Sequence, residues 1–124
     1  MEKDFIKDEE LLYRAIKPYP NWWKEKENRP SSAAFKDSLG VSVDRDAERN
    51  ELEIVGAIEE RFELKAIVKV KTAYCREIQT YPFPKPLSDN PEHAEIHRTE
   101  GIVELTDSQA RNLAKSSEIV FQKK

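Results

Sequence analysis

Two histidines and a glutamate stand at alternate positions in segment 93–97, and these residue types could do chemistry together. In an extended strand, residues i, i+2 and i+4 share one face. His93, Glu95 and His97 would therefore lie on the same side. An imidazole beside a carboxylate can transfer a proton, and three such groups could bind a divalent metal. Side chains on one flat strand splay apart, however. We therefore favour a polar strand face that holds no metal and no cofactor.

The string His93-Ala94-Glu95 is similar to the H-x-E element of the zinc-dependent nucleoside and tRNA deaminases. In that family the histidine binds zinc, the glutamate moves the proton, and a later P-C-x-x-C supplies two thiolates. The single cysteine of this chain, Cys75, precedes the histidines. Two of the three zinc ligands are therefore missing, and the resemblance stops at the histidine and the glutamate.

Arg14 and the serine pair Ser31-Ser32 are the other catalytic candidates. An arginine on a first strand, followed by serines and a later glutamate, is similar to the Arg–Ser–Glu layout of ADP-ribosyltransferase-like enzymes. That resemblance implies that Arg14 binds dinucleotide phosphates and that Glu95 orients the sugar. The serines come earlier here than in that layout. In the alternative interpretation Arg14 forms an ion pair and Ser31 caps a short helix.

Four aromatic residues are candidates for binding a protein partner: Trp22, Trp23, Tyr81 and Phe83. Adjacent tryptophans on a regular element face different ways, so we expect one in the core and one half exposed. Tyr81 and Phe83 lie in a proline-rich stretch that cannot donate a full ladder of hydrogen bonds. This stretch is typical of an edge strand or a rigid loop.

The elements that position these residues follow from hydrophobic periodicity. Residues 11–16 predict a first strand, and the alternation over 64–72 predicts the clearest strand of the chain. Apolar residues at three- and four-residue spacing predict a helix over about 46–62, capped by Asp44 or Asp46. Its expected buried positions are Leu52, Val55, Ile58 and Phe62.

A capping box at Thr106 and Gln109 predicts a second principal helix over about 107–116. Short strands are expected at 41–43, from 93 onward and at 119–121, and a turn of helix at 31–35. Helices and strands are interleaved without the rhythm of a parallel sheet. We therefore expect an α+β domain over 10–124, with a mainly antiparallel, curved sheet and two principal helices, behind a flexible N-terminus at 1–9.

Composition excludes several classes of function. The chain has 124 residues, with 21 basic and 24 acidic residues and a net charge of −3, which argues against a protein that coats nucleic acid. It has no apolar run long enough to span a membrane, and its N-terminus lacks the apolar core of a signal peptide. We therefore expect a cytoplasmic protein. A single cysteine excludes an internal disulfide, and we expect Cys75 to be a small buried residue.

Three segments resemble a family of short bacterial proteins to which no activity is attached: LYRAI at 12–16, RPSSAAF at 29–35 and NPEHAEI at 90–96. The resemblance implies a bacterial stand-alone domain that is one component of a multi-gene system.

The first functional hypothesis is an accessory protein that binds a protein partner and is not an enzyme, because the chain lacks a phosphate-binding glycine loop and a nucleophile–base pair. The alternative is a small enzyme acting on a nucleotide or RNA. Its site would bring several of the candidate residues into one pocket: Arg14, Ser31, Ser32, His93, Glu95 and His97.

Overall fold

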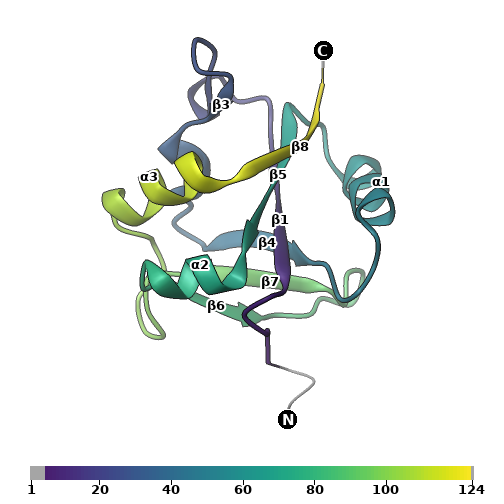
Figure 1. Ribbon diagram of the computed structural model, residues 1–124, viewed down its shortest axis with the longest axis vertical. Helices are drawn as coiled ribbons and strands as arrows, with labels where there is room; N and C mark the ends of the chain where they lie inside the picture. Colours follow the sequence, from purple (N-terminus) through teal and green to yellow (C-terminus); the bar gives the residue numbers. More distant parts are fainter. Residues whose placement is uncertain (1–4, 124) are drawn as a thin grey trace.

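A six-stranded antiparallel sheet forms the centre of the computed structural model, which describes residues 5–123 (Figure 1). The strands run in the order β6-β7-β4-β1-β5-β8, and the sheet does not close. Their bounds are β1 (Leu11–Ile16), β4 (Val41–Arg45), β5 (Ala66–Lys71), β6 (Tyr81–Pro84), β7 (His93–His97) and β8 (Glu118–Gln122). A small hairpin adds β2 (Trp23–Lys24) and β3 (Arg29–Pro30). The predicted α+β class with a mainly antiparallel sheet is confirmed.

Within residues 5–123, three α-helices and two 3-10 turns lie around the sheet: α1 (Glu51–Arg61), α2 (Thr72–Glu77), α3 (Asp107–Ser116), η2 (Pro20–Trp22) and η3 (Ser32–Phe35). The predicted helix over 107–116 is confirmed, with the capping box of Thr106 and Gln109 formed. The short α2 was not predicted. It follows β5 directly and buries Cys75, as expected for that residue.

Helix α1 starts later than predicted, and its buried side only partly matches the predicted one. Asn50, not Asp44 or Asp46, caps it in a capping box with Glu53. Asp44 lies in β4, and the Asp46 side chain accepts from the backbone amides of Leu11, at the start of β1, and of Glu48 in its own turn. The prediction of a buried Leu52 is wrong. This side chain is 86% exposed, because Ile54 faces the sheet one turn before Ile58. The predicted burial of Ile58 is confirmed, whereas Phe62, at the C-cap of α1, is 37% exposed and not buried as predicted.

The helices cover the two faces of the sheet unequally. The larger core lies on the face toward α2, α3 and η3, which we call the α3 face. The smaller core lies on the opposite α1 face, where α1 packs on β1, β5 and β8. On β4 and β7 the same α1 face carries polar side chains instead: Ser42, Asp44, His93 and Glu95. This half of the sheet is therefore where chemistry-bearing side chains gather.

One residue of the N-terminal segment, Ile6, is buried in the larger core. Residues 1–4 lie outside the described residues. Residues 5–9, which we expected to be loosely attached, pack against the domain, with Ile6 only 1% exposed and its carbonyl accepting from Arg76. No helix in the described part of the chain is long and apolar enough to cross a membrane.

Candidate functional site

The larger of the two main cavities opens where β1 and β4 separate. These strands pair only at Leu12 with Arg45 and at Tyr13 with Asp44. Beyond that point the Arg14 side chain reaches across the gap, and its Nη1 donates to the Ser42 carbonyl at 3.0 Å. The resulting Arg14 cavity has a volume of about 440 Å³. Its walls come from β1, β4, the end of α1, η2 and the loop before β7, and include Trp22, Phe62, Leu87, Asn90 and His93.

Arg14 is buried and holds three segments together. Its Nε and Nη2 donate to the Ala34 carbonyl at 3.2 and 2.9 Å, and its guanidinium carbon lies 5.0 Å from the centre of the Trp22 ring. Burial lowers its pKa to about 10, opposed by the nearby charge of Asp37. These three hydrogen bonds use three of the five N–H groups of the guanidinium. Two N–H groups are thus left without a partner among residues 5–123.

His93 is oriented by the backbone. Its Nδ1 lies 2.9 Å from the Lys85 carbonyl oxygen. Because a carbonyl only accepts, Nδ1 carries the proton, and in the neutral ring Nε2 keeps a free lone pair. His93 is only 8% exposed and lines the Arg14 cavity. The ring is therefore held in the tautomer that a general base requires.

Charges in the cavity wall are balanced. It carries three cations, Arg14, Lys17 and Arg61, and three carboxylates, Asp37, Asp44 and Asp89. Asp44 forms an ion pair with Arg61 and accepts from the Asn90 amide at 3.2 Å. A ligand in this cavity would meet polar groups of both signs rather than a concentrated positive field.

Glu95 and His97 are brought together, but apart from the cavity. The Glu95 carboxylate lies 2.8 Å from His97 Nε2 and 3.5 Å from Lys85 Nζ. The Phe83 ring meets His97 edge-on, with centroids 4.7 Å apart. Among the described residues no cluster of three or more His, Cys, Asp or Glu side chains could hold a metal. The alternating residues on β7 thus form a Glu95–His97 pair, and His93 lies separately at the Arg14 cavity.

The two serines do not line the Arg14 cavity. Ser31 occupies the N-cap position of η3, but its hydroxyl bonds the Asn21 carbonyl instead of an amide of the turn. The prediction that its side chain caps a short helix is therefore wrong, because the hydroxyl is turned toward the Asn21 carbonyl of η2. Ser32 is the first residue of η3.

The aromatic candidates divide as predicted for adjacent tryptophans. Trp23 is 7% exposed and lies under Lys65, whereas Trp22 is partly exposed and lines the cavity. Tyr81 and Phe83 stack on each other with centroids 5.4 Å apart on the outer strand β6.

Several residues of the site were not predicted. Asp44, Arg61 and Asn90 form its polar network, yet they stand far apart in the sequence. Asn90 belongs to the segment 90–96 that carries the family resemblance, which was the one available signal. Asp44 was interpreted as one of two candidate helix caps, and no role was predicted for Arg61.

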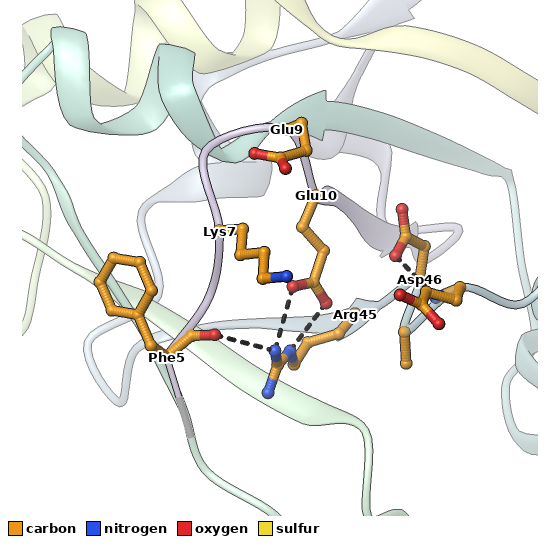
Figure 2. Close-up of a pocket in the computed structure, with 8 residues that line it drawn as sticks. Phe5, Lys7, Glu9, Glu10, Arg45 and Asp46 are labelled. Carbon is orange, nitrogen blue, oxygen red and sulfur yellow. Dashed lines mark hydrogen bonds and ion pairs between the residues drawn. The ribbon is translucent and has the colours of Figure 1, made fainter. Parts of the chain in front are cut away.

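A second cavity, of about 360 Å³, lies between the N-terminal segment and the loop after β4 (Figure 2). Arg45 crosses it, and donates to the Glu10 carboxylate at 2.8 and 3.0 Å and to the Phe5 carbonyl at 3.4 Å. Its central charged groups already satisfy one another. This arrangement attaches the N-terminal segment to the sheet and is less suited to a ligand than the Arg14 cavity.

No protein-family model, no curated protein and no solved structure matches this chain. The resemblance to short bacterial proteins stays a prediction. A functional assignment has to come from the chemistry of the Arg14 cavity.

Proposed function

We propose that the Arg14 cavity binds a nucleotide or a short segment of RNA, and that His93 acts there as a general base. One observation carries this proposal: Arg14, Trp22 and His93, which lie far apart in the sequence, line the same cavity. An arginine, an aromatic ring and an oriented imidazole are groups that bind phosphate, stack with a base and accept a proton.

The balanced wall limits the charge of the ligand. Each of the three cations has a carboxylate counterpart in the same wall, so a ligand with several phosphates gains little attraction. We therefore expect a nucleoside monophosphate, or one nucleotide of an RNA chain, rather than a triphosphate. The net charge of −3 is compatible with such a short contact, because it argues only against extensive coating of nucleic acid.

The chemistry that fits this arrangement is cleavage of the RNA phosphodiester by attack of the neighbouring 2′-hydroxyl. The hydroxyl proton passes to Nε2 of His93, the 2′-oxygen bonds to the phosphorus, and the bond to the 5′-oxygen breaks. The departing oxygen takes its proton from water. Cationic N–H groups of Arg14 or Lys17 would stabilise the added negative charge on the phosphorus. The products are a 2′,3′-cyclic phosphate and a 5′-hydroxyl end.

Binding is tested by titrating the protein with uridine and adenosine monophosphates and with adenosine triphosphate, measured by calorimetry. We expect saturable binding of at least one monophosphate and weaker binding of the triphosphate. Asn90→Ala should weaken binding, because it removes a polar group from the wall. Asn112→Ala, on the partly exposed side of α3, is the matched control. Absence of saturable binding to every nucleotide and to an RNA oligonucleotide would contradict the proposal.

Catalysis is tested with an RNA oligonucleotide and its DNA counterpart. His93→Asn keeps an amide that can donate to the Lys85 carbonyl but removes Nε2. It should leave binding within about threefold and reduce RNA cleavage by roughly a hundredfold or more. His97→Gln keeps a donor toward Glu95 and serves as the control with unchanged cleavage. Cleavage that persists in His93→Asn, or that acts equally on DNA, would exclude His93 as this base.

A second proposal retains the accessory role, with Tyr81 and Phe83 contacting a protein partner as one component of a multi-gene system. Its support is the stacked pair on the outer strand β6, where Tyr81 is 37% exposed. A pull-down from an extract of the source organism should lose a stoichiometric partner with Tyr81→Ser and retain it with Leu52→Ser, an exposed apolar residue on α1. Equal recovery with both variants would rule out this surface.

A further inference from the structure

The two outer strands of the sheet differ in how they protect their free edges. Outer strands expose unpaired amides and carbonyls, which soluble proteins usually blunt with prolines, charges or bulges. Strand β6 carries Pro82 and Pro84, which cannot donate. Strand β8 contains no proline and has three successive apolar residues, Ile119–Phe121, all partly exposed. The β8 edge therefore lacks these protections; beside it, the Asn28 side chain of the β2–β3 turn exchanges hydrogen bonds of 2.8 and 3.3 Å with the Gln122 side chain and leaves the Gln122 backbone groups unused.

The backbone groups that β8 presents outward follow from its pairing with β5. The Lys123 amide donates to the Lys65 carbonyl, whereas the Lys65 amide donates to the Ile16 carbonyl of β1. The Lys65 carbonyl therefore points toward β8 and, by alternation, so do the backbone groups of Ile67 and Lys69. Their partners Phe121 and Glu118 consequently face β5.

The residues between these ladder positions face away from β5. They are Ile119, opposite Val68, and Gln122, opposite Ala66, on the two sides of the β-bulge. Within residues 5–123 no hydrogen bond outside the ladder uses the backbone amide or carbonyl of either residue. Two outward-facing pairs of donor and acceptor are thus unused.

We propose that β8 pairs antiparallel with β8 of a second copy of this chain, with Ile119 opposite Gln122 of the second copy. This register makes both outward-facing residues into hydrogen-bonded pairs. It also places Glu118 opposite Lys123 and Val120 opposite Phe121 of the second copy. A twofold axis between the strands repeats each pair, so the two sheets join into one continuous sheet.

The side chains favour this register. Glu118 lies opposite Lys69 on the α1 face, and Lys123, one residue beyond Gln122, projects to that face too. Neither Glu118 nor Lys123 forms an ion pair among the described residues. The dimer therefore gains two cross-strand ion pairs and two apolar pairs of Val120 with Phe121. The Arg14 cavity lies across β1 and β4, so this interface and the proposed binding site are tested independently.

The charge pairs are tested by exchange, with sedimentation equilibrium as the measurement. The native chain should show a dimer of twice its 14.4 kDa mass that dissociates on dilution. Glu118→Lys and Lys123→Glu should each weaken dimerisation by roughly tenfold, because each creates two like-charged pairs across the axis. The double exchange should restore the native association, since both pairs become attractive again.

The backbone pairing is tested at Gln122. Gln122→Pro removes an outward N–H without removing a donor to β5, whereas Gln122→Ala keeps that N–H and loses the same side chain. We expect the proline variant to be monomeric and the alanine variant to dimerise, with unchanged circular dichroism in both. A native chain that is monomeric up to millimolar concentration would overturn the proposal and leave the edge for a strand of another protein. So would a dimer that is insensitive to the charge exchange and to Gln122→Pro.

Discussion

At the scale of single residues, burial changes the chemistry of groups that look reactive in the sequence. Cys75 lies in α2 beneath the α3 face, and burial raises the pKa of its thiol to about 12. Because the thiolate is the nucleophile, we expect this cysteine to be unreactive toward electrophiles in the folded protein. His93 differs, because its Nδ1 hydrogen bond to the Lys85 carbonyl leaves Nε2 unprotonated in the neutral ring, and its side chain lines the Arg14 cavity.

We predict that Cys75 makes a contribution to the free energy of unfolding that is lost at alkaline pH. The folded state keeps the thiol protonated to about pH 12, while in the unfolded chain it ionises near its ordinary value of 9. The folded state therefore binds more protons in this window, and the contribution is complete below pH 9 and lost as the pH rises toward 12. Urea unfolding of the native chain should lose more stability across this window than Cys75→Ala. Equal losses would show that other groups account for the decrease.

At the scale of elements, Gly40 and Gly56 differ in whether their positions could accept a larger residue. Gly40 precedes β4 with a φ of +106°, and a Cβ there would lie 2.7 Å from Glu95 Oε1 and 2.8 Å from His97 Nε2. Gly56 lies inside α1, and a Cβ there would meet nothing within 4 Å. The entry into β4 requires glycine, whereas the helix only tolerates it.

Replacement of these glycines by alanine should therefore change stability in opposite directions. Gly40→Ala should lower the free energy of unfolding by about 1–3 kcal/mol, because it strains the backbone and displaces the Glu95–His97 pair. Gly56→Ala should raise it by about 0.5–1 kcal/mol through helix propensity. Denaturant titration of the two variants beside the native chain measures both effects. A neutral Gly40→Ala would mean that the pair over Gly40 moves aside freely.

At the scale of the whole molecule, Arg14 holds several segments of the fold together. It joins β1 to β4 through Ser42 and to η3 through Ala34, and it stacks on Trp22. A buried cation is costly unless it is hydrogen-bonded, and here backbone carbonyls supply the bonds. The same side chain keeps β1 and β4 apart and so maintains the cavity.

Loss of Arg14 should thus destabilise the fold as well as the site. Arg14→Leu leaves the carbonyls of Ala34 and Ser42 without their donors, which should cost about 2–5 kcal/mol. Arg29→Leu, which removes an arginine paired with the exposed Glu27, should cost less than about 1 kcal/mol. Thermal and urea unfolding compare the two variants. A small effect of Arg14→Leu would indicate that β1 and β4 close the gap and pair further along their length.

Local patterns alone determined the element types: the alternation over 64–72, the capping box before 107 and the apolar runs at 11–16 and 119–121 each predict an element that forms. They also predict the antiparallel α+β class, because period and capping act over a few neighbouring residues. Only the tertiary structure decided that α1 buries Ile54 and not Leu52, that β1 separates from β4 and that His93 lies apart from Glu95 and His97. These three features depend on contacts between residues that are distant in the sequence, such as Asp44 and Asn90. A pattern that spans a few neighbouring residues carries no information about such contacts.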